Sequence, residues 1–321
     1  MRPLSKNWTS LPGSIALVAA LLTPASALAE ISWEKAITAV EEKSSEYYDY
    51  AMSLGSGHPG TALNGIGHDQ HICAITGRML GFREEIEEAE TLDEPPLSPD
   101  VDPMEIMIHA VTLDAWVAAA RRAVELTENQ KKSLWNLECV GKHGIPRSAY
   151  LDDPELKGDF SINGDTLVVY GDIDSGFHER FGDALDANPD IVQVALGSAG
   201  GSVYDALLAG VTIRERGLST TLHGPCFSAC PLVFMGGVKR TIWMGPGPHL
   251  GFHRVYNGTG EVPLSDDVYM HITEYLLRMD VNPAAVVGWM IKAGQYDMFE
   301  PDLEDLCPPK VATWVQRMCS S

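Results

Sequence analysis

The chain has 321 residues, with 44 acidic and 23 basic side chains and a formal net charge of −21. A surface this acidic repels the phosphates of nucleic acids and of anionic membranes, which argues against both as partners. The length allows a full hydrophobic core, in one large domain or two smaller ones.

The N-terminus has the three parts of a secretory signal peptide. Arg2 and Lys6 supply positive charge, residues 14–22 form a short apolar segment, and an Ala-x-Ala cleavage site ends at Ala29, before Glu30. The apolar segment is about half as long as a membrane-spanning helix requires. We therefore expect a periplasmic or secreted protein that has no membrane span once the signal peptide, positions 1–29, is cleaved.

Residues 30–160 are predicted to form a mostly helical N-terminal region. Apolar side chains recur every three or four residues in residues 32–54 and 103–137, which is the pattern of helices that bury one face. Acidic residues and prolines fill residues 83–103 between these segments. This composition predicts a solvated linker or a long loop.

All six cysteines follow the expected cleavage site, at Cys73, Cys139, Cys226, Cys230, Cys307 and Cys319. An even number of cysteines in an exported protein predicts disulfides, but six cysteines allow 15 pairings. Cys73 closely follows His58, His68 and His71, which offers a zinc site as an alternative. These residues lie in one segment without a second paired half, so we predict neither a metal nor another cofactor.

Residues 161–321 are predicted to form an α/β domain. Short apolar strands alternate with helical segments, an order that predicts a buried and largely parallel sheet. The expected strands are residues 165–173, 190–196 and 219–224, and the expected helices are residues 176–188, 203–217, 264–279 and 283–294. A Gly-Pro turn is expected to end the strand at Gly224.

The segment GPCFSACPLVFMGG, residues 224–237, places Ser228 between Cys226 and Cys230. We expect Ser228 in the first turn of a helix, where free N–H groups and the helix dipole favour a developing negative charge. A nucleophilic serine needs such donors, because the tetrahedral intermediate carries an oxyanion. Serine is also a favoured N-cap, so capping is the alternative role. The two cysteines either bridge across the turn or pack separately as small apolar side chains.

The segment GSAGGSV, residues 197–203, has paired glycines after a predicted strand. Glycine lets the backbone approach a ligand closely. A backbone donor from Gly201 that faces Ser228 is the functional interpretation, and a tight strand-to-helix turn is the structural one.

A histidine follows a further predicted strand, KRTIWM, at residues 239–244. His253 lies 25 residues after Ser228, and an imidazole is the side chain best suited to act as a base near neutral pH. Neighbouring parallel strands bring their ends together, so His253 can reach back to Ser228. His249 in the same segment and His223 in the preceding strand are rivals for this role.

In this order and spacing, the paired glycines, Ser228 and His253 resemble the proteolytic subunit of Clp protease. They resemble more closely the exported Clp-protease-like proteins of the Clp/crotonase superfamily, over about residues 165–315. The resemblance implies a Clp/crotonase-like α/β fold of stacked ββα units. It also implies that Ser228 is the nucleophile, that His253 is the general base, and that the backbone N–H groups of Gly201 and Ala229 form the oxyanion hole.

The same resemblance places the triad acid in QYDMFEPDLEDL, residues 295–306. The family has an aspartate just before an aromatic-containing stretch, which corresponds to Asp297. Asp302 and Asp305 are rivals. Such an acid is expected to be buried beside His253, where it orients the imidazole.

Family members assemble into rings, so the resemblance also implies a homo-oligomer that acts on peptides or unfolded protein segments. Export excludes an ATP-driven unfoldase as a partner. We expect the subunit contact in residues 265–279, whose apolar side chains follow helical spacing. These are Val268, Ile272, Tyr275, Leu276 and Met279.

We therefore predict an exported serine endopeptidase that works through an acyl-enzyme. The main alternative is a non-catalytic binding or scaffold protein on the same fold. Acyl-CoA chemistry does not need a Ser–His pair and would lack CoA after export. A Ser–Lys peptidase would need a lysine base, and the nearest candidate downstream, Lys239, opens a strand.

Overall fold

The computed structural model describes residues 33–57, 67–82, 94–153, 156–243, 249–257 and 259–320. The predicted signal peptide and His58 lie outside these residues, and so does most of the predicted acidic linker. In the described part of the chain, no helix is long and apolar enough to cross a membrane.

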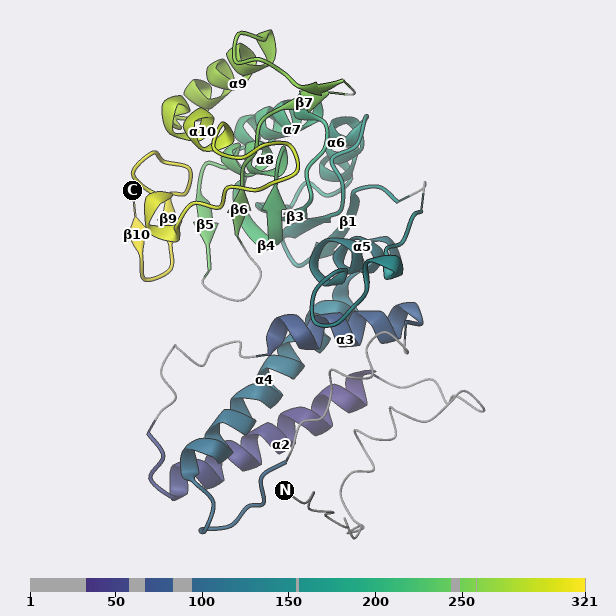
Figure 1. Ribbon diagram of the computed structural model, residues 1–321, viewed down its shortest axis with the longest axis vertical. Coiled ribbons are helices and arrows are strands. Elements are labelled where there is room, and N and C mark those ends of the chain that lie inside the picture. Colours follow the sequence, from purple (N-terminus) through teal and green to yellow (C-terminus); the bar gives the residue numbers. More distant parts are fainter. Residues whose placement is uncertain are drawn as a thin grey trace, which may run out of the picture.

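The first half of the chain is helical, as predicted (Figure 1). Its elements are α2 (Trp33–Ser53), α3 (His68–Leu80), α4 (Pro103–Glu125), α5 (Glu128–Leu134), the π-helix η4 (Trp135–Cys139) and the 3-10 helix η5 (Arg147–Ala149). The start of α4 shows the local chemistry, because Asp102 caps it by accepting a hydrogen bond from the Met104 amide and Pro103 occupies the first turn. A disulfide between Cys73 and Cys139 ties α3 to η4.

The second half is an α/β sheet structure, which confirms the predicted fold class (Figure 1). Its strands are β1 (Asp159–Asn163), β2 (Thr166–Tyr170), β3 (Gln193–Ser198), β4 (Ser219–Phe227), β5 (Arg240–Ile242), β6 (Leu250–Gly251), β7 (Tyr256–Asn257), β8 (Gly260–Glu261), β9 (Trp314–Val315) and β10 (Cys319–Ser320). Its helices are α6 (Phe177–Ala187), α7 (Val203–Glu215), α8 (Cys230–Met235), α9 (Asp267–Arg278), α10 (Pro283–Met290) and the 3-10 helix η6 (Leu303–Asp305).

The main sheet runs in the order β1-β2-β3-β4-β5-β9-β10, and β6 pairs with the end of β4. The pairs from β2 to β9 are parallel, and only the outer strands β1 and β10 are antiparallel to their neighbours. Side chains alternate between the faces of the sheet. Leu167 and Val169 of β2 join the core that also contains residues of α6 to α9, whereas Tyr170 joins the core of the helical region.

Strand β4 is longer than the sequence suggests. We expected it to end at the Gly-Pro turn, but it continues through Pro225 to Phe227. The pairing with β3 shifts register between Leu196 and Ser198, so Pro225 falls at a bulge, where a missing N–H interrupts no ladder bond. Beyond the bulge, the Cys226 amide donates to the His249 carbonyl, 2.9 Å away. The end of β4 is therefore anchored beside β6.

A buried ion pair joins the helical region to the sheet. Arg122 of α4 contacts Glu138 of η4 at 2.6 Å, with 11% and 6% of the two side chains exposed. Tyr170 of β2 donates its hydroxyl hydrogen to the same carboxylate, and Arg122 lies 3.3 Å from the Tyr170 oxygen. Both halves of the chain thus contribute to one hydrogen-bonded cluster.

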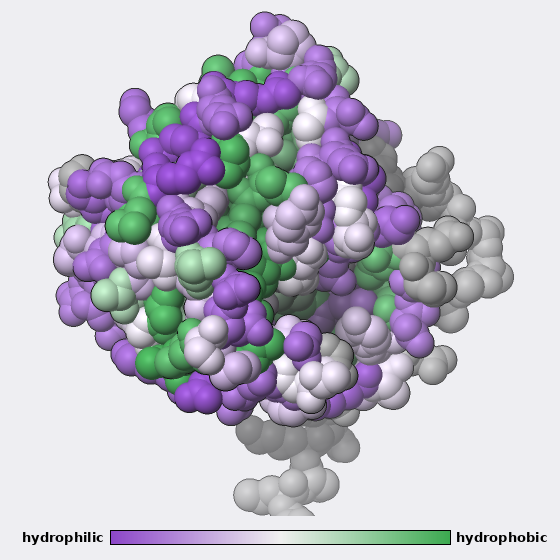
Figure 2. Space-filling view, turned by 90° about the horizontal axis from the view of Figure 1, so that it is seen from above, coloured by the Kyte–Doolittle hydropathy of each residue, from purple (hydrophilic) through white to green (hydrophobic). Residues whose placement is uncertain are grey.

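The expected subunit contact on α9 is wrong in its residues. Ile272, Tyr275, Leu276 and Met279 are at most 4% exposed and belong to the core of their own chain. The amphipathic pattern therefore reflects packing of α9 on α8, where the Tyr275 hydroxyl donates to the Leu232 carbonyl. Viewed from above, the molecule is mostly hydrophilic, with apolar side chains in a band between polar ones (Figure 2). Self-association stays a prediction.

Candidate active site

Ser228 lies in the turn between β4 and α8 and has an uncommon backbone conformation. Its φ is 59°, in the left-handed region that non-glycine residues rarely adopt. Its amide donates to the Gly251 carbonyl at 3.0 Å, which fixes the turn against β6. The N-cap of α8 is Ala229, without a side-chain cap. Ser228 therefore does not cap the helix, and among the described residues its hydroxyl has no hydrogen-bond partner.

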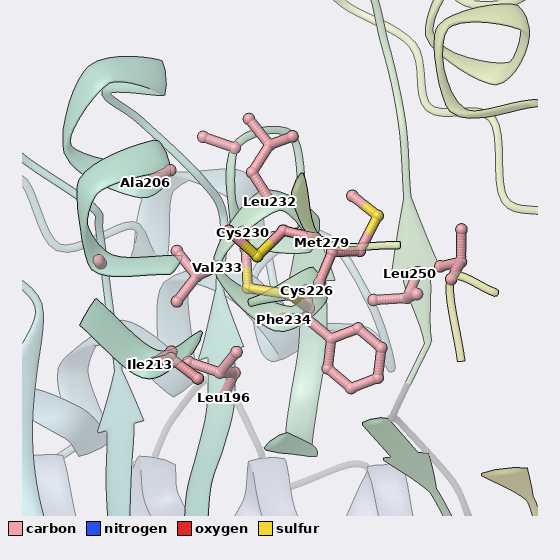
Figure 3. Packing of buried hydrophobic residues seen from close by; sticks show 14 of the residues in the cluster. Leu196, Ala206, Ile213, Cys226, Cys230, Leu232, Val233, Phe234, Leu250 and Met279 are labelled. Atoms are coloured by element: carbon pink, nitrogen blue, oxygen red, sulfur yellow. A yellow bond between two sulfur atoms is a disulfide. The ribbon is translucent and has the colours of Figure 1, made fainter. Parts of the chain in front are cut away.

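The two cysteines that flank Ser228 are joined to each other. Cys226 at the end of β4 and Cys230 at the start of α8 form a disulfide with a Cα–Cα distance of 5.2 Å. Both cysteines are fully buried, and the bridge lies among apolar side chains such as Val233 and Phe234 (Figure 3). Of the two interpretations of this pair, the bridge across the turn is correct. It closes a five-residue ring around the serine.

The first of the paired glycines lies directly against the serine turn, and the second lies against Ile173. A Cβ on Gly200 would stand 2.4 Å from the Ser228 Cβ and 2.9 Å from the Ala229 nitrogen, and a Cβ on Gly201 would stand 2.3 Å from the Ile173 carbonyl oxygen. Their φ values are 103° and 137°. Both the space and the conformation therefore require glycine.

Two backbone amides near the serine turn are unpaired among the described residues. The amides of Gly201 and Ala229 have no hydrogen-bond partner among the described residues, whereas the neighbouring Ser202 amide donates to the Ile173 carbonyl at 2.7 Å. Unpaired amides are the donors that an oxyanion needs in acyl transfer.

His253 follows β6, the strand that receives the Ser228 amide. It is 7% exposed, and its Nδ1 lies 2.7 Å from the Arg254 carbonyl oxygen. A carbonyl can only accept, so Nδ1 carries the hydrogen in this bond and Nε2 keeps a free lone pair. His253 therefore has the tautomer that a general base needs.

The two rival histidines have other environments. His249 lies 3.3 Å from Glu300, and its ring packs edge-on against Phe227. Burial lowers the pKa of His223 to about 3, with a smaller contribution from the positive charge of Arg122. His223 therefore stays neutral, and its ring packs edge-on against Tyr170 of the cluster under the sheet.

The acids proposed from the sequence lie in an exposed loop. Asp297, Asp302 and Asp305 are all exposed, and the Asp297 amide donates to the Gly294 carbonyl. In the described part of the chain, none of the three carboxylates contacts His253, whose Nδ1 is occupied by Arg254. The structure thus brings Gly200 against Ser228 and places β6, the strand before His253, beside the serine turn. Among the described residues it shows no hydrogen bond between Ser228 and His253, and no carboxylate in contact with His253.

Near the glycines lies a histidine–carboxylate pair that the sequence did not predict. Nδ1 of His178 lies 2.6 Å from Asp205, which also accepts the Ser202 hydroxyl at 2.6 Å. Burial opposes the charge of Asp205, but the hydrogen bonds from His178 and Ser202 outweigh it and lower the pKa of the carboxyl. Asp205 also accepts from the Gly176 and His178 amides, so it joins the starts of α6 and α7. The separation of 27 residues carries no local sequence signal.

The alternative zinc site loses one of its candidate ligands. Cys73 is bonded to Cys139 and is not available as a ligand. The described residues contain no group of three or more histidine, cysteine or acidic side chains that could hold a metal.

No known protein family and no curated protein matches the sequence. Among solved structures, a mutant of the 1510-N membrane-bound stomatin-specific protease is 15% identical over 47% of this chain and 77% of its own, with a TM-score of 0.37. A second mutant of that protease, in complex with a substrate peptide, is 16% identical over 47% of this chain and 73% of its own, with a TM-score of 0.36. A ClpP1 mutant from Listeria monocytogenes is 13% identical over 49% of this chain and 91% of its own, with a TM-score of 0.31.

Proposed function

We propose that this protein is an exported, Clp-protease-like serine peptidase in which Ser228 is the nucleophile. The observation that supports this proposal best is the serine turn itself. A strained serine with a free hydroxyl packs against Gly200, and a disulfide closes the turn around it. Two residues next to this contact, Gly201 and Ala229, have unpaired amides. A serine with a structural role would satisfy its hydroxyl, and strain of this kind gathers at functional sites.

The proposed chemistry gives each of these groups a role. His253 takes the hydroxyl proton on Nε2 while the Ser228 oxygen forms a bond to the substrate carbonyl carbon. The amides of Gly201 and Ala229 stabilise the oxyanion. When the carbon–nitrogen bond breaks, His253 returns the proton to the leaving amine. Water then hydrolyses the acyl-enzyme by the same two steps.

The acid in the proposed triad is Asp297, with Asp302 and Asp305 as alternatives. In the structure, the Arg254 carbonyl already fixes the tautomer of His253, which is one of the roles of a triad acid. An aspartate would add stabilisation of the imidazolium, and Asp297 would have to turn inward to provide it. A loss of rate in Asp297→Asn would show that it does so.

The proposed substrates are peptides or unfolded protein segments, and the proposed state is a homo-oligomer that works without an ATP-driven unfoldase. The three disulfides indicate an oxidising environment, in agreement with export. The alternative, a non-catalytic binding protein, is favoured by one observation. All three candidate acids are exposed and lie apart from His253.

A fluorophosphonate probe separates the two functions. We expect it to label the wild-type protein and the Ser265→Ala variant, which lacks an exposed serine on the loop before α9, but not Ser228→Ala. Undiminished labelling of Ser228→Ala would show that another residue reacts. Absence of labelling in the wild type, with a normal circular dichroism spectrum, would favour the binding protein.

A further inference from the structure

A pocket of about 170 Å³ opens at the carboxyl ends of β2 and β3. It is below the size of pockets that hold whole small-molecule ligands, and it suits a single side chain. The helical region and the sheet both line it, through residues that include Ser133, Asn136, Tyr150, Gly171, Asp172 and Ala199.

The pocket adjoins the serine site through the glycine loop. Ala199 precedes Gly200, which packs on Ser228, and the Ile173 amide donates to the Gly200 carbonyl at 2.8 Å. Asp172 therefore lies on a segment paired with the glycine loop, and Ser228 lies on the far side of that loop. Two strand spacings separate Asp172 from Ser228, on the order of 10 Å. If the Gly201 amide binds the carbonyl of the cleaved substrate bond, a long side chain on the same substrate residue can span this distance.

Asp172 gives the pocket a negative charge that the chain does not neutralise. Among the described residues, Asp172 has no cationic partner, whereas the neighbouring Asp174 is paired with Arg180 at 2.5 Å. Partial burial raises the pKa of the Asp172 carboxyl, and the charge of Asp174 raises it further. A bound cation would relieve both effects.

Tyr150 adds an aromatic face to the pocket, and the backbone on both sides of it is held by hydrogen bonds. Its side chain is 58% exposed. On one side the Trp135 indole donates to the Ala149 carbonyl at 2.7 Å, and on the other the Asn136 side chain exchanges two 2.9 Å hydrogen bonds with the Leu151 backbone. An exposed ring that lines the same pocket as a carboxylate is a favourable site for a cation.

Ser133 supplies a second, independent sign of a ligand. It lines the pocket and is only 7% exposed, yet its buried hydroxyl oxygen has no hydrogen-bond partner. Gly171 allows α5 to come this close, because a Cβ there would stand 2.8 Å from the Ser133 oxygen. Buried hydroxyls in native proteins are normally paired, so the Ser133 oxygen is available to a ligand that carries an N–H group.

We propose that this pocket selects a lysine or arginine side chain of the substrate, at the residue on the acyl side of the cleaved bond. This inference rests on the proposed peptidase function. Asp172 pairs with the cation, Tyr150 covers it, and Ser133 accepts a hydrogen bond from its N–H groups. The helical N-terminal region thus has a role in the reaction, because it supplies two of these three groups.

The test compares three probes on the full-length protein. One is a neutral alkyl fluorophosphonate, and the others are peptidyl diphenyl phosphonates identical except for a lysine or a norleucine analogue at the reacting residue. We expect the wild type to react about tenfold or more faster with the lysine probe than with the norleucine probe. In Asp172→Asn this ratio should fall toward one, and in the matched control Asp190→Asn, an exposed acid at the opposite end of the sheet, it should not change. Tyr150→Ala should lower the ratio about two- to fivefold, and Tyr150→Phe should retain it.

The outcomes separate this inference from the function on which it rests. Reaction with the neutral probe together with equal rates for the two peptidyl probes would overturn the pocket but not the peptidase. A lysine preference that survives in Asp172→Asn would overturn the assignment of Asp172. Failure of all three probes to label Ser228 would overturn both proposals.

Discussion

At the scale of single residues, the site depends on a position without a side chain. Gly200 has no side chain, and this allows Ser228 and the Ala229 amide to stand beside it. The backbone of Ser228 stores strain of about 1–3 kcal/mol, which the surrounding turn must maintain.

A single methyl group at Gly200 should therefore disrupt the site. In Gly200→Ala, the new Cβ would overlap the Ser228 Cβ at 2.4 Å and the Phe227 carbonyl oxygen at 2.7 Å. We expect fluorophosphonate labelling to fall by about 10²–10³, the usual effect of losing one oxyanion donor. Gly182→Ala in α6 is the control, because a Cβ there meets no atom within 4 Å, and it should label at the wild-type rate.

The identity of the base can be tested in the same assay. We expect His253→Gln to lose most of the labelling rate, by several orders of magnitude, because it removes the lone pair that accepts the serine proton. His249→Gln and His223→Gln should retain most of it. The measurement is the labelling rate against pH for the three variants. A normal rate in His253→Gln, together with a loss of rate in either of the other variants, would show that His253 is not the base.

At the scale of elements, two disulfides with different spans should differ in what they support: the longer span contributes more to stability and the shorter one more to activity. Cys73–Cys139 closes a separation of 66 residues and Cys226–Cys230 a separation of 4. On the chain-entropy estimate, they contribute about 4 and about 2 kcal/mol to the free energy of unfolding. We expect the double alanine variant at positions 73 and 139 to be the less stable, and the one at 226 and 230 to lose more activity.

Urea unfolding and probe labelling of the two double variants measure these effects. Without the bridge between positions 226 and 230, the strained turn at Ser228 would no longer be held in place. The labelling rate of that variant should therefore fall. An unchanged rate in the variant lacking Cys226 and Cys230 would show that β6 alone fixes the serine.

The sequence predicted the central strands β2 to β5 and the helices packed on them, because alternating strands and helices have strong local patterns. It also predicted the turn at Ser228 and offered the bridge around it as one of two interpretations. It did not predict the strands β1, β6, β9 and β10. It did not predict that β4 passes through Pro225, since a bulge depends on the register of the neighbouring strand. The amphipathic α9 was misread for a similar reason: periodicity shows that one face is buried, but not against what.

The pocket was beyond sequence reasoning altogether. Tyr150 and Asp172 belong to different regions and meet only when the helical region packs on the sheet. The ring orientation of His253 is likewise set by one carbonyl of the fold. The predicted boundary between the two regions, at residues 160 and 161, stays a prediction.

At the scale of the whole molecule, buried histidines couple stability to pH. Burial lowers the pKa of His71 to about 4, with a smaller effect of His68. The unfolded chain binds a proton there near pH 6.5, whereas the folded chain resists until about pH 4. Between these values the unfolded state holds more protons, so the free energy of unfolding falls as the pH falls.

We expect His71 alone to account for about 3 kcal/mol of lost stability by pH 4. His71→Leu should therefore flatten the dependence of the urea midpoint on pH between 6.5 and 4.5. The exposed His271 provides the control, because His271→Leu should keep the wild-type slope. Equal slopes in all three proteins would show that His71 does not carry this effect.

The order of the disulfides along the chain has a consequence for how the protein matures. Each cysteine is joined to the next one in sequence: the first to the second, the third to the fourth, and the fifth to the sixth. A chain that enters an oxidising compartment from its N-terminus presents its thiols in the same order. An oxidase that joins each new thiol to the one still waiting would then produce the native pattern directly. Maturation would need a disulfide-forming enzyme but no disulfide isomerase.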